Sequence, residues 1–160
     1  MILVRASTAL HILALGLWVG GLATIAFVVA PTAFKVVPRE TAGLLVGDSL
    51  RVFGNLELIF GAVALFTGLI CQFVGVWGPR VRWPRLLSLV GMAVLSLVYT
   101  QSIYPRMRDL RPAAQAGAVE AKGEFDRLHR LSTRVVGANL LLGIVVLGVS
   151  AATMKSPEGS

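Results

Sequence analysis

The chain has 160 residues, of which 56% are hydrophobic and only 14% are charged, and its net charge is +7. Soluble domains carry about 25% charged residues, so the composition excludes an ordinary soluble domain and favours an integral membrane protein. The positive charges lie in the segments between apolar runs, which favours contact with anionic lipid head groups over nucleic acid. A single cysteine excludes an internal disulfide.

Four long apolar runs cover residues 6–30, 52–77, 86–104 and 135–153. About 20 apolar residues cross a hydrocarbon core of roughly 30 Å, so each run predicts a transmembrane helix. The first run is longer than the apolar part of a cleaved signal peptide, which has about 7–15 residues, so we expect it to be retained. We therefore expect an all-α integral membrane protein. Its four-transmembrane-helix bundle would form a single domain over residues 1–155, followed by a disordered tail at 156–160.

The segments between the runs carry helical patterns of their own. Pro38 suits the first turn of a helix, and residues 41–53 place apolar side chains at helical spacing. Residues 112–131 have an apolar face and a charged face. We expect both segments to be short interfacial helices in the loops, the first bending near Gly54 as it enters the second span.

The distribution of positive charge predicts the orientation in the cell membrane. Four spans place both termini on one side, where there are five basic residues: Arg5, then Arg80, Arg82 and Arg85 in a short loop, and Lys155. The other side has ten: Lys35, Arg39, Arg51, Arg106, Arg108, Arg111, Lys122, Arg127, Arg130 and Arg134. The positive-inside rule then predicts a multi-pass protein with a cytoplasmic 106–134 loop and both termini outside.

Small residues indicate where the helices approach one another. The second run has a glycine at every seventh position, and the first has a Gly-x-x-x-Gly pair; the six predicted packing positions are Gly54, Gly61, Gly68, Gly75, Gly16 and Gly20. Glycine at such spacing allows close approach of a neighbouring helix. Among the tryptophans, Trp77 and Trp83 are expected to be interfacial anchors, and Trp18 shares a helix face with His11.

One candidate site is a polar cluster near the arginine-rich side. Glu57 lies just inside the second span, Gln101 inside the third and Asn139 inside the fourth. A carboxylate in hydrocarbon is costly unless paired, so Glu57 must face the bundle and find a donor or a cation. Arg106 and Arg134 are the expected cations, and His129 lies at the same rim. The cluster is interpreted either as a structural clamp or as a substrate, ion or proton site.

The second candidate is His11, near the side of the termini. Cys71 and Met92 lie at comparable depth, and Met154 ends the fourth span. Imidazole, thiolate and thioether suit a soft cation such as Cu(I), and a single histidine can also ligate haem. The alternative is that His11 is structural and the sulfur atoms only pack. The predicted topology argues against one haem bound by both His11 and His129, because it separates them by roughly 20–30 Å.

Four segments carry a resemblance to a known family: residues 11–21 (HILALGLWVGG), 30–34 (APTAF), 103–111 (IYPRMRDLR) and 125–134 (FDRLHRLSTR). Together they resemble the transmembrane protein 205-like family, a bacterial domain of unknown function, over about residues 5–153. The resemblance implies a four-helix membrane protein; in eukaryotes the family is linked to tolerance of a platinum drug, and no reaction comes with it. The first segment alone is similar to the membrane domain of copper resistance protein D, which would give His11 a metal role.

Three functional hypotheses follow. The first is a non-enzymatic membrane protein that aids metal or small-molecule tolerance or transport. The second is a haem-binding membrane oxidoreductase, and the third is a structural partner subunit of a membrane complex. The lipid bilayer is the expected environment, and the expected partners are anionic lipid head groups together with a second copy of the chain or another membrane protein. No hydrolase triad, phosphate loop or zinc motif is present in the sequence.

Overall fold

The computed structural model describes residues 2–153. Met154 and the expected disordered tail at 156–160 lie outside the described residues. Within them every regular element is helical, and the helices are α1 (Ile2–Thr24), η1 (Ile25–Val29), α2 (Ala30–Val36), α3 (Arg39–Phe73), α4 (Pro79–Val98), η2 (Tyr99–Ile103), α5 (Tyr104–Gln115) and α6 (Val119–Ala152).

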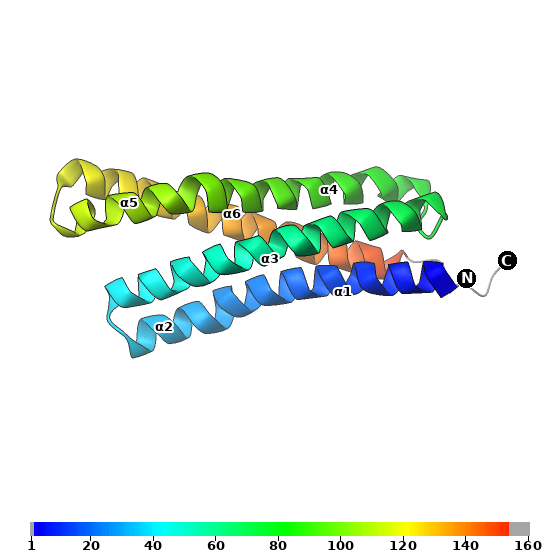
Figure 1. Ribbon diagram of the computed structural model, residues 1–160, viewed down its shortest axis with the longest axis horizontal. Coiled ribbons are helices and arrows are strands. Elements are labelled where there is room, and N and C mark those ends of the chain that lie inside the picture. The colour runs from blue at the N-terminus through cyan, green and yellow to red at the C-terminus, as the bar shows by residue number, and fades with distance from the viewer. Residues whose placement is uncertain (1, 154–160) are drawn as a thin grey trace.

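These elements join into four long rods, which confirms the expected all-α bundle of four membrane-type helices. The rods are Ile2–Val36, Arg39–Phe73, Pro79–Gln115 and Val119–Ala152, each long and apolar enough to cross a membrane. They run side by side, with the start of α1 and the end of α6 at the same end of the bundle (Figure 1). This architecture is compatible with a multi-pass membrane protein.

The rods are longer than the apolar runs that predicted them. The 35 residues of Ile2–Val36 span about 52 Å at 1.5 Å per residue, against roughly 30 Å for a hydrocarbon core. Segments 41–53 and 112–131 are almost entirely helical, but they continue the spans along their axes instead of lying along the interface. In particular, α3 is one unbroken helix through Gly54. The rods are therefore longer than a hydrocarbon core is thick.

Two π-helical segments interrupt the first and third rods. In each case a proline follows closely: Pro31 after η1 and Pro105 after η2. Proline lacks an N–H and its ring clashes with the carbonyl four residues earlier, which would kink or break a regular α-helix. A wider π-helical turn accommodates this clash, so both rods continue through their prolines.

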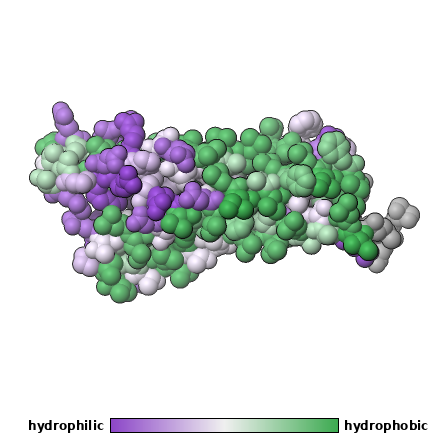
Figure 2. Space-filling view, viewed as in Figure 1, coloured by the Kyte–Doolittle hydropathy of each residue, from purple (hydrophilic) through white to green (hydrophobic). Residues whose placement is uncertain are grey.

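The surface divides into two regions along the bundle. Hydrophilic residues gather at the end formed by α5, the start of α6 and the α2–α3 turn, and hydrophobic residues cover the middle (Figure 2). Large apolar side chains such as Phe66, Leu141 and Val145 are exposed there. An exposed apolar band of this kind is the surface that a bilayer would cover.

The helices form a four-membered ring in which α1 packs on α3, α3 on α4, α4 on α6 and α6 on α1. Its core contains Leu15, Trp18, Ala64, Leu89 and Val146, all almost completely buried. A second apolar cluster, of Ile103, Met107 and Leu128, holds the polar end together.

The glycines of α3 make room for specific side chains of neighbouring helices. A Cβ added at Gly54 would lie 2.4 Å from Thr100 Cγ2, one at Gly61 would lie 2.9 Å from the Trp18 ring, and one at Gly68 would lie 3.1 Å from His11 Cε1. These three α3 glycines thus act as sockets, that is, positions without a side chain that Thr100, Trp18 and His11 occupy.

The other three predicted packing glycines differ from expectation. A Cβ at Gly16 or Gly20 would meet no atom within 4 Å, because this pair faces away from the neighbouring helices. The close approach of α1 is made instead at Gly21, where an added Cβ would overlap the Phe53 ring. Gly75 lies beyond the end of α3 and has φ +76°, a left-handed conformation that favours glycine in the turn before α4.

Candidate functional site

A polar layer crosses the bundle at Glu57. Asn139 Nδ2 donates a hydrogen bond to Ser96 Oγ at 2.9 Å, and Ser96 Oγ donates to Glu57 Oε2 at 2.5 Å. All three side chains are buried, and they come from α6, α4 and α3 respectively. Hydrogen bonds between membrane helices contribute about 0.6 kcal/mol on average, so this chain joins three rods modestly.

The layer leaves polar capacity unused. Glu57 Oε1 and Asn139 Oδ1 are buried and have no hydrogen-bond partner among the described residues. A small cavity of about 10 Å³ lies against Glu57, Ser96 and Asn139. No ion pair to Glu57 is formed within the described part of the chain. The indole N–H of Trp18, also buried without a hydrogen-bond partner of ordinary geometry within residues 2–153, is a donor beside the carboxyl group. The site therefore consists of a buried carboxyl group that faces polar donors but no neutralising cation.

The other residues predicted for this cluster lie elsewhere. Gln101 is exposed on η2, and Arg134 is exposed on α6. Arg106 donates to Glu124 at 2.8 Å, so its cationic head is paired at the polar end of the bundle. His129 is exposed and lines a separate cavity. The expected charge partners of Glu57 thus stay at the rim, because long arginine side chains reach toward water rather than into the apolar bundle.

A second buried network surrounds His11 at the opposite end. His11 Nδ1 lies 2.9 Å from the carbonyl oxygen of Ala64, and His11 Nε2 lies 2.8 Å from Arg85 Nη2. A carbonyl only accepts and a guanidinium only donates, so Nδ1 carries the proton and Nε2 accepts. Both ring nitrogens are therefore engaged.

Arg85 is the centre of this network. Its Nε donates to Ser150 Oγ at 2.8 Å, and its guanidinium lies 3.5 Å from the centroid of the Trp77 ring. Trp77 Nε1 in turn donates to the Ser150 carbonyl at 3.1 Å. A desolvated cation over a tryptophan face contributes about 2 kcal/mol or more. Two expectations change here: Arg85 is buried inside α4 rather than in a loop, and Trp77 is buried rather than an interfacial anchor.

The His11 site does not fit copper or haem. A metal needs the free lone pair of an imidazole nitrogen, and here Nδ1 donates to Ala64 while Nε2 accepts from Arg85. The adjacent guanidinium also repels a cation. Cys71 is buried with its sulfur 3.4 Å from Thr8 Oγ1. Within residues 2–153, no group of three or more His, Cys, Asp or Glu side chains is placed to hold a metal ion.

The two networks are separate. Ser96, which contacts Glu57, lies 11 residues after Arg85 on α4, so the networks are about 16 Å apart along the bundle. Leu89 and Met92, almost fully buried, fill the space between them. The buried carboxyl group and the buried guanidinium therefore do not neutralise each other.

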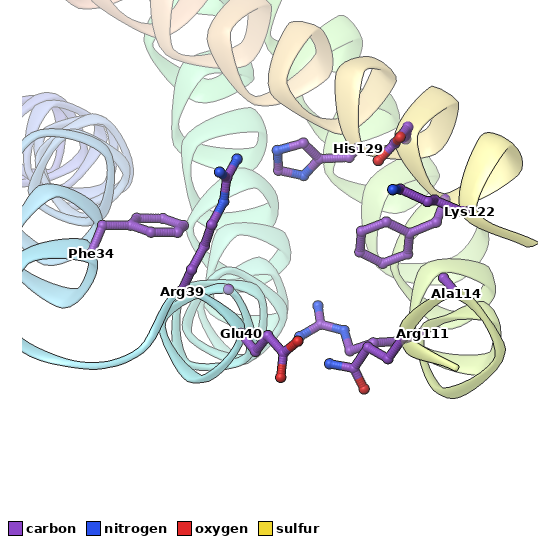
Figure 3. Close-up of a pocket in the computed structure, with 11 residues that line it drawn as sticks. Phe34, Arg39, Glu40, Arg111, Ala114, Lys122 and His129 are labelled. Atoms are coloured by element: carbon purple, nitrogen blue, oxygen red, sulfur yellow. The ribbon is translucent and has the colours of Figure 1, made fainter. Parts of the chain in front are cut away.

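A larger cavity opens at the polar end, between the α2–α3 turn, α5 and the start of α6 (Figure 3). Its volume is about 660 Å³, and its lining carries the cations Arg39, Arg111 and Lys122 together with the carboxylates Glu40 and Asp126. His129 and Phe34 face it from opposite sides (Figure 3). Charges of both signs line this cavity, so it favours no ligand of a single charge.

Sequence reasoning missed Arg85, Ser96 and Ser150. A signal for the first was present, because Arg85, Leu89, Met92 and Ser96 recur at the spacing of one helix face. Extending the buried face of α4 backwards from Ser96 would have included Arg85. The serines gave no signal, since single serines are common in membrane helices and only the tertiary structure shows their partners.

Comparison with known proteins identifies a family. The family described as Domain of unknown function (DUF4149) matches residues 13–116, which is more than half of the chain. This stretch contains Glu57, Arg85 and Ser96 but not Asn139 or Ser150. No curated protein and no solved structure matches the chain. The chain therefore belongs to the DUF4149 family, a domain of unknown function.

Proposed function

We propose that this protein is a non-enzymatic multi-pass membrane protein that aids small-molecule or metal tolerance or transport, with Glu57 as the group that binds a proton or a small cation. The observation that carries the proposal is the buried Glu57 carboxyl group, which has one unpartnered oxygen and no cation beside it. An ionisable residue inside a membrane bundle is costly, and such residues commonly line proton or ion pathways.

The surroundings of Glu57 support binding rather than simple clamping. A clamp would use all polar atoms, whereas Glu57 Oε1, Asn139 Oδ1 and Trp18 Nε1 are all buried without a hydrogen-bond partner of ordinary geometry in the described part of the chain. The adjacent cavity of about 10 Å³ is close to the smallest space that holds one water molecule. A water molecule there, or a proton on the carboxyl group, would give Glu57 Oε1 and Asn139 Oδ1 a hydrogen-bond partner. In this proposal the arginine-rich end faces the cytoplasm, and Glu57 exchanges its proton or cation along the bundle.

Other expectations also belong here as proposals. A role in tolerance is what the resemblance to the transmembrane protein 205-like family implies, whereas the DUF4149 match carries no function. A second copy or another membrane protein is a proposed partner. A haem-dependent oxidoreductase gains no support, because both nitrogens of His11 are engaged.

Infrared spectroscopy of the purified protein in lipid tests the role of Glu57. If Glu57 binds a proton, wild-type protein should show the C=O band of a buried protonated carboxyl group that is lost as the pH rises. If it binds a cation, carboxylate bands should shift when the cation is added, and Glu57→Gln should abolish either signal. Glu120→Gln, an exposed carboxyl on α6, is the matched control and should leave the signal intact.

The functional arm uses growth in toxic metal salts. A strain that lacks the gene is complemented with wild-type, Glu57→Gln or Glu120→Gln protein. We expect Glu57→Gln to accumulate normally yet fail to complement, because the amide keeps the hydrogen bonds but cannot take up a proton. Full complementation by a stable Glu57→Gln protein would remove Glu57 from the functional site.

A further inference from the structure

A cleft on the outer face of the polar end is lined mainly by arginine. It lies between the third rod and α6 and has a volume of about 410 Å³. Its lining carries Arg106 from α5 and Arg127, Arg130 and Arg134 from α6, and no carboxylate. It thus differs from the cavity of Figure 3, where carboxylates accompany the cations.

The three α6 arginines lie on one face of their helix. Positions 127, 130 and 134 are spaced three and four residues apart, so their side chains are neighbours. All three are exposed, and they form no ion pair within the described part of the chain. Like charges at this spacing repel one another, and a bound anion would relieve that repulsion.

The cleft lies where the apolar part of the bundle begins. Arg134 immediately precedes the apolar run at 135–153, and Arg127 lies about 10 Å farther out along the helix. The same cleft is lined by Val98 and Leu131, which are 39% and 44% exposed. Arginine therefore occupies the level of the lipid head groups, and apolar side chains are available to acyl chains.

We propose that this cleft binds the head group of an anionic phospholipid, with the guanidinium groups of Arg127, Arg130 and Arg134 on its phosphate. Arginine presents N–H groups in a planar fork that matches two phosphate oxygens, and it is the preferred residue for such contacts. Basic pockets between membrane helices on the cytoplasmic side are suited to anionic head groups. Arg106, already paired with Glu124, forms the opposite wall.

Lipid binding is measured by native mass spectrometry and by thermal unfolding of the detergent-solubilised protein with added phosphatidylglycerol or phosphatidylcholine. Phosphatidylglycerol should bind and stabilise the wild-type protein more than phosphatidylcholine does. Each arginine contributes about 1 kcal/mol near a membrane surface, so Arg130→Gln should weaken phosphatidylglycerol binding about fivefold. Arg127→Gln/Arg130→Gln should weaken it about 25-fold.

Arg108→Gln is the matched control, because Arg108 is 65% exposed at the same end but outside the cleft. It removes the same charge and should leave phosphatidylglycerol binding within about twofold of wild type. An equal loss in Arg108→Gln and Arg130→Gln would overturn the site and leave only a general effect of net charge. All variants should unfold at the wild-type temperature in phosphatidylcholine, since the substituted side chains are exposed.

A further arm replaces the lipid with inorganic phosphate, which carries the same ligand chemistry without acyl chains. We expect little stabilisation by millimolar phosphate. If phosphate stabilises the wild-type protein as strongly as phosphatidylglycerol, and Arg130→Gln abolishes both effects, the lipid assignment is wrong and the cleft takes a free anion.

Discussion

Alanine substitutions at two glycines separate close packing from helix propensity. Gly54→Ala adds a methyl group 2.4 Å from Thr100 Cγ2, which is about 1 Å short of an ordinary contact. Thr100 cannot rotate away freely, because its hydroxyl donates to the Ser96 carbonyl at 2.9 Å. Gly16→Ala adds the same methyl group where no atom lies within 4 Å. Both changes gain the same helix propensity, about 1 kcal/mol.

The difference between the two variants is therefore the cost of overpacking, about 1–3 kcal/mol. For a chain of this size, 1 kcal/mol corresponds to about 2–4 °C in Tm, so Gly54→Ala should unfold roughly 2–12 °C below Gly16→Ala. Tryptophan fluorescence during heating in one detergent gives both values, and Gly20→Ala is a second open-space control. Equal melting temperatures for Gly54→Ala and Gly16→Ala would refute the role of the α3 glycines as sockets.

Two further predictions concern the buried arginine and the orientation. Arg85→Lys should lower the free energy of unfolding by about 1–3 kcal/mol, because lysine cannot bond both His11 and Ser150. The control Arg80→Lys, at an exposed position, should be neutral. Thermal unfolding measures both variants, and equal stability would refute a structural role for the Arg85 guanidinium. In a Cys71→Ser background, Ser160→Cys should react with an impermeant thiol reagent on intact cells and Gln115→Cys only after permeabilisation. The reverse pattern would invert the proposed topology.

The sequence determined the fold class and the four rods. Hydrophobic runs of 19 residues or more have few alternatives to a membrane helix, since only a helix satisfies its backbone within one segment. The runs also indicated that Glu57 faces the bundle, because an isolated carboxyl group cannot face lipid. Their ends were less well predicted, since α3 and α6 continue as polar helices where hydropathy no longer identifies a span.

Only the tertiary structure decided which polar groups meet. Depth along a helix predicted Gln101 as a partner of Glu57, but rotation about the helix axis turns Gln101 outward and Ser96 inward. The π-helical turn before Pro105 changes that rotation in the same region. Arg85 was assigned to a loop because it precedes the third run, yet α4 begins at Pro79 and carries Arg85 into the bundle. The spacing within α4 indicates which of its residues share a face, but which side chains meet across helices depends on how whole helices pack, and no local stretch of sequence encodes that.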